Sequence, residues 1–259
     1  PLPAGLSRDG EPVFLDLDFL DGTRGAHVNI SGVSGVATKT TYATFLLYSL
    51  FESGQLGNES ANTKALIFNV KGEDLLFLDH PNTMLRSEDH DRYTRLGLTP
   101  GPFTSVDVFA PPRRGDRNAA PDVTSRTEGV TSVFWTIEQF CADELLPFLF
   151  ADAEDDRQQY TMVVSNVAAE LKRAAATHTV ADSGAVVIGG TTVTTFAQLV
   201  NEIESMVIDV DGAPGPWAGR SIGMGTINAF VRRLHGAVRH IAPLVRADVA
   251  RPGDHQVDF

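Results

Sequence analysis

Residues 26–40 read Ala26-His-Val-Asn-Ile-Ser-Gly-Val-Ser-Gly-Val-Ala-Thr-Lys-Thr40, and residues 41–51 continue Thr41-Tyr-Ala-Thr-Phe-Leu-Leu-Tyr-Ser-Leu-Phe51. The alternating apolar residues at the start predict a short strand over 26–30, which Gly32 and Gly35 interrupt. Apolar residues at helical spacing then predict a helix over 40–52. The stretch therefore predicts the order strand, glycine-bearing loop and helix.

This order suits a phosphate-binding loop. Because a polyphosphate carries several negative charges, such a loop points consecutive backbone N–H groups at it, and the next helix offers its positive N-terminal end. Lys39 is placed to reach the terminal phosphates as a point charge, and the hydroxyl of Thr40 to ligate the accompanying Mg2+. The stretch predicts a nucleotide site. The alternative is a plain strand-to-helix turn whose lysine is only solvated.

The loop departs from the standard spacing at two positions. The standard is Gly, four residues, Gly, Lys and then Ser or Thr. Thr38 stands where the second glycine belongs, and Gly32 lies one residue too far from Lys39. Since a β-branched residue tolerates positive φ poorly, we expect the loop to follow a path different from the usual one.

The composition is that of an ordinary globular chain. Its 259 residues are 42% apolar, which is enough for a substantial core. No apolar run reaches the length of a membrane span, and the start lacks the layout of a signal peptide, so we expect no membrane partner. The single cysteine, Cys141, is expected to be a buried thiol and fits a reducing, cytoplasmic compartment.

A formal charge of −12 argues against a broad nucleic-acid-binding surface, although a ring can line a narrow channel with a few basic residues. Four arginines lie in the polar stretch 113–126, which is predicted to be an exposed loop: Arg113, Arg114, Arg117 and Arg126. They are candidates for contact with a nucleic acid or with a neighbouring subunit's phosphates, and a solvated face is the alternative.

The chain around the loop is expected to form a parallel sheet. Residues 13–20 predict an edge strand, 64–70 a buried parallel strand and 104–110 a third strand. A strand, a helix and a second strand in this order along the chain predict a right-handed βαβ unit. In such a unit, residues near the carboxyl end of 64–70 face the ligand crevice. Asn69, Lys71 and Glu73 are therefore candidates for the second wall of the site. The alternative is that they belong to a solvated turn.

From about residue 128 the pattern becomes helical, with helices expected over 136–149, 155–177, 195–207 and 222–244. A P-loop enzyme also needs an acid at the end of an apolar strand to hold the metal and polarise water. Asp209 is the nearest candidate, but it continues a helix, and a helix end is the preferred interpretation. Arg232 and Arg233 are candidates for an arginine finger, against surface charge as the alternative.

The sequence motifs at residues 27–43 and 65–75 resemble those of the bacterial HerA/FtsK-type P-loop ATPases. The resemblance extends over about residues 11–80. The resemblance implies an α/β fold with a RecA-like parallel sheet, flanking helices and a helical insertion. It also implies ATP and Mg2+ as cofactors, a homo-oligomeric hexameric ring, and ATP-driven translocation on DNA. The residues implied to bind the nucleotide, with Lys39 also catalytic and Thr40 also the metal ligand, are Gly32, Ser34, Gly35, Val36, Ala37, Thr38, Lys39, Thr40 and Thr41.

The resemblance also implies a division of the chain. Residues 1–127 are expected to form the N-terminal part of the ATPase core, 128–245 a mainly helical insertion, and 246–259 the start of a segment that leads back to the core. Because the sequence begins at Pro1 and offers no convincing metal-binding acid, we expect it to be an excerpt of a longer chain. The alternative function is a catalytically degenerate P-loop domain with an interaction or regulatory role, which binds nucleotide weakly or not at all.

Overall fold

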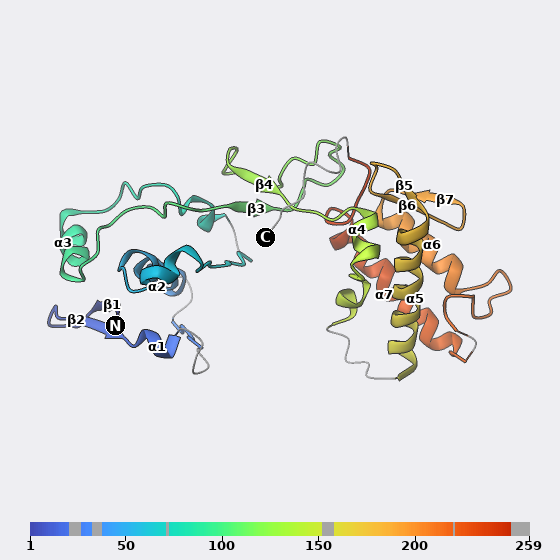
Figure 1. Cartoon of the computed structure of the whole chain (residues 1–259), viewed down its shortest axis with the longest axis horizontal. Helices are drawn as coiled ribbons and strands as arrows, with labels where there is room; N and C mark the ends of the chain where they lie inside the picture. The colour runs from blue at the N-terminus through green and yellow to red at the C-terminus, as the bar shows by residue number, and fades with distance from the viewer. Residues whose placement is uncertain (21–26, 33–37, 71–72, 152–157, 220, 250–259) are drawn as a thin grey trace. The chain divides into compact units, whose positions relative to one another are not determined.

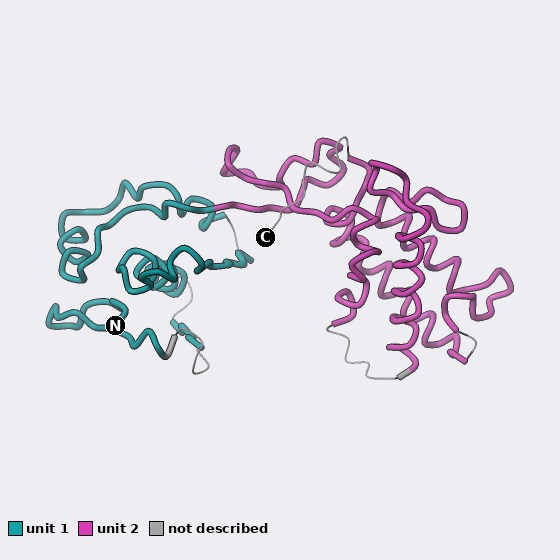
Figure 2. The backbone as a smooth tube through the Cα atoms, in the orientation of Figure 1, with its two compact units in different colours: residues 1–106 teal, residues 107–259 magenta. Residues whose placement is uncertain are grey.

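The computed structural model describes residues 1–20, 27–32, 38–70, 73–151, 158–219 and 221–249 (Figure 1). The chain mixes helices with small parallel and antiparallel sheets and divides into two compact units, residues 1–106 and 107–259 (Figure 2). The predicted boundary after residue 127 falls inside the second unit. The reason is that β3 (Val108–Ala110) pairs in parallel with β4 (Val130–Ser132), which ties the two sides of that boundary together.

The first unit starts with an antiparallel hairpin of β1 (Leu2–Leu6) and β2 (Pro12–Leu15). Its remaining elements are α1 (Leu17–Leu20), α2 (Thr38–Glu52), η1 (Gly57–Ala61), η2 (Asp74–Phe77) and α3 (Ser87–Arg95). The edge strand predicted over 13–20 is therefore shorter than expected, because the helical turn α1 replaces its second half. The helix predicted over 40–52 is confirmed as α2 and begins two residues earlier.

Two predicted strands are wrong for the described backbone. Residues 27–30 and 64–70 form no strand, so the described residues contain no βαβ unit around α2. A continuous apolar run becomes a strand only when a neighbouring strand supplies the backbone hydrogen bonds. The prediction of these two strands required such a neighbour for each of them. The apolar side chains of the second segment are left in solvent, with Leu66, Phe68 and Val70 exposed by 70%, 81% and 90%.

The second unit is mainly helical. Besides β3 and β4 it contains a small antiparallel sheet of β5 (Thr179–Val180), β6 (Ala185–Ile188) and β7 (Thr191–Val193). Its helices are α4 (Ile137–Ala142), η3 (Leu146–Phe150), α5 (Gln158–Thr177), α6 (Phe196–Val207) and α7 (Met224–Ile241). The single helix predicted over 136–149 is divided because Glu144 adopts a positive φ of 54°, which a right-handed helix does not accommodate.

The main hydrophobic core lies within the second unit, where α4, α5, α6 and α7 bury the apolar faces that their periodicity predicts. Its largest fully buried side chains include Ile137, Leu171, Phe196, Leu199, Ile203, Ile227, Phe230 and Leu234. Cys141 belongs to this core and is 1% exposed, which confirms the prediction of a buried thiol. Burial raises the pKa of that thiol to about 12, so it stays protonated and unreactive at neutral pH.

Candidate nucleotide-binding site

The candidate site begins at the N-terminus of α2, where Lys39, Thr40 and Thr41 lie in the first turn and are exposed. The first N–H groups of a helix have no acceptor inside the helix, and with the helix dipole they favour a bound anion. The hydroxyl of Thr44, one turn further on, donates to the carbonyl oxygens of Thr40 and Thr41 at 3.0 Å each. The lysine and hydroxyl groups predicted for phosphates and metal thus share one solvent-facing turn.

Thr38 is the first residue of α2. A helical backbone has a negative φ that any residue adopts, so this position does not require the conformational freedom of glycine. Gly32 is described and exposed, whereas Ser34, Gly35, Val36 and Ala37 lie outside the described residues. The expected change in the loop's path therefore stays a prediction, and the described part of the site is its helical half.

The hairpin holds α2 by two hydrogen bonds from hydroxyl groups to carbonyl oxygens of β1. The Tyr42 hydroxyl donates to the carbonyl of Ala4 at 3.0 Å. The fully buried hydroxyl of Ser49 donates to the carbonyl of Pro3 at 2.6 Å. These bonds fix one side of the helix against the hairpin and leave the turn that bears Lys39 open to solvent.

An aromatic cluster holds the other side of α2. Tyr48 packs edge-on against Phe103, with ring centroids 5.4 Å apart, and against Tyr93 of α3 at 6.2 Å. Its hydroxyl donates to the carbonyl of Thr99 at 2.6 Å. Desolvation, with a smaller contribution from the Glu52 carboxylate, raises the pKa of Tyr48, so the phenol remains a donor. These anchors were not predicted, because their partners are distant in the sequence and their only local signal is the repeated placement of Tyr and Ser along one apolar helix.

The predicted second wall is described in part. Lys71 lies outside the described residues. Asn69 is exposed in the irregular segment before it, and Glu73 is half-buried at the N-cap of η2. The structure thus places Asn69 and Glu73 in the same unit as Lys39, and their role in binding stays a prediction.

Asp209 lies just after a helix, as the preferred interpretation predicted. Helix α6 ends at Val207, and Ile208 is its C-cap. The backbone N–H of Asp209 donates to the carbonyl of Ala213 at 2.8 Å, and its carbonyl accepts from the N–H of Gly212 at 2.8 Å. Asp209 therefore belongs to a tight turn rather than to the end of an apolar strand.

The arginine-rich stretch 113–126 is more ordered by side-chain contacts than predicted. Arg126 is only 8% exposed, and its Nε donates to the carbonyl of Glu128 at 2.8 Å. Arg113 donates to the carbonyl of Val123 at 3.0 Å, and Arg114 donates to the carbonyl of Arg239. The prediction of an exposed loop is therefore wrong for Arg126, because backbone carbonyls can satisfy a buried guanidinium.

The two arginines proposed as fingers differ in their surroundings. Arg233 donates from Nε to the carbonyl of Leu149 at 3.2 Å, and its guanidinium carbon lies 5.6 Å from the centroid of the Phe150 ring. Arg232 is exposed, and the structure gives it no hydrogen bond or ion pair with any described residue. Of the two, Arg232 is the side chain that can reach a neighbouring molecule without breaking contacts of its own.

The described residues include no group of three or more His, Cys, Asp or Glu side chains placed to hold a metal ion. A P-loop magnesium site is built from one Ser or Thr hydroxyl together with phosphate oxygens and water, so a site of that kind needs no cluster of acidic side chains; the role predicted for Thr40 stays a prediction. None of the described helices is long and apolar enough to cross a membrane.

Comparison with known proteins adds no assignment: no protein-family model matches the chain, and no curated protein matches its sequence.

Proposed function

We propose that this chain is the ATP-binding part of a HerA/FtsK-like P-loop ATPase and binds Mg-ATP at the N-terminus of α2. The observation that carries the proposal is the start of α2 at Thr38, directly after the glycine-bearing segment. In this arrangement Lys39 neutralises the terminal phosphates, and Thr40 supplies a hydroxyl ligand to Mg2+. The backbone N–H groups of the first turn complete the anion site.

A RecA-like parallel sheet is the second part of the proposal. It is supported by the exposed apolar segment that follows α2, in which Leu66, Phe68 and Val70 face solvent. Full burial of one such side chain is worth about 1.5–3 kcal/mol, so this segment gains considerable free energy when it joins a covered sheet. We propose that residues 64–70 become a central strand of that sheet, with flanking helices and the helical second unit as an insertion.

Hydrolysis and movement on DNA are the third part. Asp16 follows the apolar strand β2, but that strand belongs to an antiparallel hairpin and not to a parallel core sheet. We therefore propose that the hydrolytic site is completed by an acid elsewhere in the core and by a neighbour's arginine. A homo-oligomeric, hexameric ring brings such an arginine to each ATP, and Arg232 is the candidate because it is exposed. The ring then acts as a cytoplasmic DNA translocase.

The alternative is a catalytically degenerate domain that keeps the fold and serves interaction or regulation. This alternative rests on the departure from the standard loop sequence at Thr38, although the helical backbone at that position does not itself require glycine. The two functions differ in a measurable way, because only the first requires a productive complex of Thr40 with Mg2+ and the nucleotide.

Replacement of Thr40 by alanine tests the metal ligand. We expect Thr40→Ala to weaken Mg-ATP binding by about tenfold, the loss of roughly one charge-assisted contact, and to leave the affinity for metal-free ATP unchanged. Thr40→Ser keeps the hydroxyl and is the matched control. Titration calorimetry with Mg2+ and with a chelator separates the two cases. Equal affinities of Thr40→Ala and wild type for Mg-ATP would show that Thr40 is not a ligand.

DNA binding can be recognised by the dependence of its affinity on salt concentration. Each phosphate neutralised by an arginine or lysine contributes about −0.9 to the slope of log K against log salt concentration for duplex DNA. For the assembled ring we expect a slope of several units, measured by fluorescence anisotropy with labelled duplex. Retained ATP binding with no salt-dependent DNA binding would instead favour a nucleotide-dependent regulator.

A further inference from the structure

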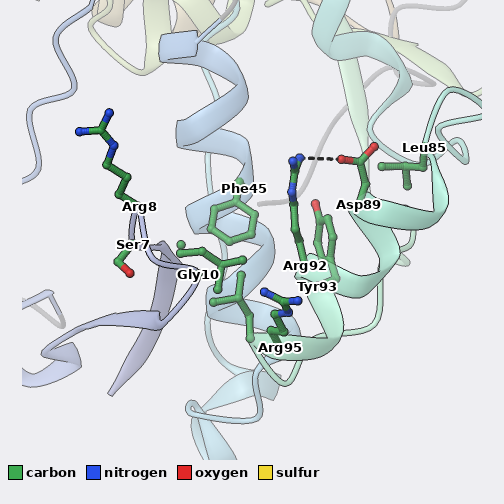
Figure 3. A pocket seen from close by; sticks show the side chains of 12 residues that line it. Ser7, Arg8, Gly10, Phe45, Leu85, Asp89, Arg92, Tyr93 and Arg95 are labelled. Carbon is green, nitrogen blue, oxygen red and sulfur yellow. Dashed lines mark hydrogen bonds and ion pairs between the residues drawn. The ribbon is translucent and has the colours of Figure 1, made fainter.

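A pocket of about 600 Å3 lies within the first unit, and Lys39 is not among the described residues that line it (Figure 3). Three elements form it: the turn between β1 and β2, the middle of α2, and α3 with the segment before it. The floor is apolar and aromatic, with Phe45, Tyr93 and Leu96 among its residues. This size is typical of a site for a small organic molecule, and such sites usually combine an apolar lining with a few polar groups.

The rim of this pocket is positively charged. Among the described residues, Arg8, Arg92 and Arg95 line it, against a single carboxylate, Asp89. Nη1 of Arg92 lies 3.0 Å from Oδ1 of Asp89, so these two charges compensate each other. Arg8 and Arg95 have no hydrogen bond or ion pair with any residue that the structure describes. Two uncompensated guanidinium groups therefore border one pocket in a chain whose formal charge is −12.

The backbone of the hairpin turn makes room for one of these groups. Gly10 has a φ of +85°, and a Cβ at this position would lie 3.1 Å from Nη1 of Arg95. Figure 3 shows the Arg95 side chain passing beside this glycine. The guanidinium of Arg95 thus sits against the turn, at the edge of the apolar floor, where it can contact a ligand that lies on Phe45.

We propose that this pocket binds a small organic phosphate with an aromatic or apolar body. The body lies against Phe45 and Tyr93, and the phosphate contacts the guanidinium of Arg95, whereas the Arg8 side chain points away from Phe45 in Figure 3 and contributes positive charge from the edge of the pocket. A phosphate monoester carries a charge of about −1.5 to −2 at neutral pH, which suits a described lining with three arginines and one carboxylate better than a singly charged carboxylate ligand does. The planar guanidinium also offers paired donors that suit phosphate oxygens.

The first experiment titrates the protein with four probes by calorimetry: phenyl phosphate, benzoate, phenol and inorganic phosphate. We expect saturable binding of phenyl phosphate and at least about tenfold weaker binding of each other probe, because each lacks either the aromatic body or the double charge. If phenol binds as tightly as phenyl phosphate, the pocket does not recognise an anion. If benzoate binds as tightly as phenyl phosphate, the pocket does not select a phosphate over a carboxylate. Absence of saturable phenyl phosphate binding overturns it entirely.

Variants locate the binding. Arg95→Gln is expected to weaken phenyl phosphate binding by about tenfold, whereas Arg232→Gln, which removes an exposed arginine of the second unit, leaves it unchanged. Lys39→Ala is also expected to leave it unchanged, so failure at the nucleotide site and failure at this pocket are distinguishable. Loss of binding in Lys39→Ala with retention in Arg95→Gln would assign the probe to the nucleotide site.

A gain of affinity provides a test that unfolding cannot imitate. Asp89→Asn removes the one carboxylate among the described lining residues. It keeps a side-chain oxygen that can accept from the backbone N–H of Arg86, as the Asp89 carboxylate does at 3.1 Å. Arg92 then becomes a third uncompensated cation. We expect phenyl phosphate to bind about threefold more tightly, an effect that declines as salt is added. Unchanged or weaker binding in this variant would contradict the role of the rim charges.

Discussion

Lys39→Ala is expected to weaken Mg-ATP binding by roughly 10- to 150-fold, the equivalent of about 1.5–3 kcal/mol for one hydrogen bond to a charged group. The lysine lies in the exposed first turn of α2, so its removal deletes a charge without opening a cavity. The measurement is titration calorimetry with Mg-ATP, supported by a thermal melt that shows the variant to be folded.

The matched control is Lys64→Ala. Lys64 is an equally exposed lysine of the same unit, and it lies outside the loop and helix that form the candidate site. We expect it to bind Mg-ATP as wild type does. If wild type and Lys39→Ala bind equally well, α2 is an ordinary helix with a solvated lysine. ATPase activity of the complete protein that disappears in Lys39→Ala would instead exclude the degenerate alternative.

Phe196→Ala is expected to lower the free energy of unfolding by about 3–5 kcal/mol. The Phe196 side chain is fully buried at the start of α6, and its ring packs edge-on against Phe140 with centroids 5.7 Å apart. Truncation removes that contact and leaves a cavity among side chains that cannot all move in to fill it. Urea denaturation followed by circular dichroism provides the value.

Phe148→Ala is the control for this stability prediction. Its side chain is 74% exposed, so the same chemical change is expected to alter the free energy of unfolding by no more than about 0.5 kcal/mol. Similar losses for Phe148→Ala and Phe196→Ala would mean that the core around α6 is not closely packed.

The helices could be predicted from the sequence because their signals are local. Helix α6 has an apolar face, and Thr195 caps it by accepting from the backbone N–H of Gln198 at 3.3 Å. Strands depend on partners distant in the sequence, which explains why 26–30 and 64–70 were predicted and are absent from the described backbone. The short pairing of β3 with β4 gave no signal for the same reason.

In the candidate site too, features set by neighbouring residues could be predicted, and features set by residues distant in the sequence could not. The position of Lys39 at a helix start followed from neighbouring residues and is confirmed. The two hydrogen bonds between α2 and β1 join residues that are separated by 38 and by 46 positions in the sequence, and no local pattern specifies such pairs. The pocket beside Arg95 was also missed, because its lining comes from the turn between β1 and β2, from α2 and from α3, which meet only in the folded unit.

The two bonds between α2 and β1 also have a mechanical consequence. Tyr42 and Ser49 lie seven residues apart, so they attach the helix to the strand at two points separated by about 10 Å along its axis. The acceptors of the two bonds, Ala4 and Pro3, are adjacent in β1, so one short segment of the strand holds α2 at both points, and disruption of that segment removes both bonds together.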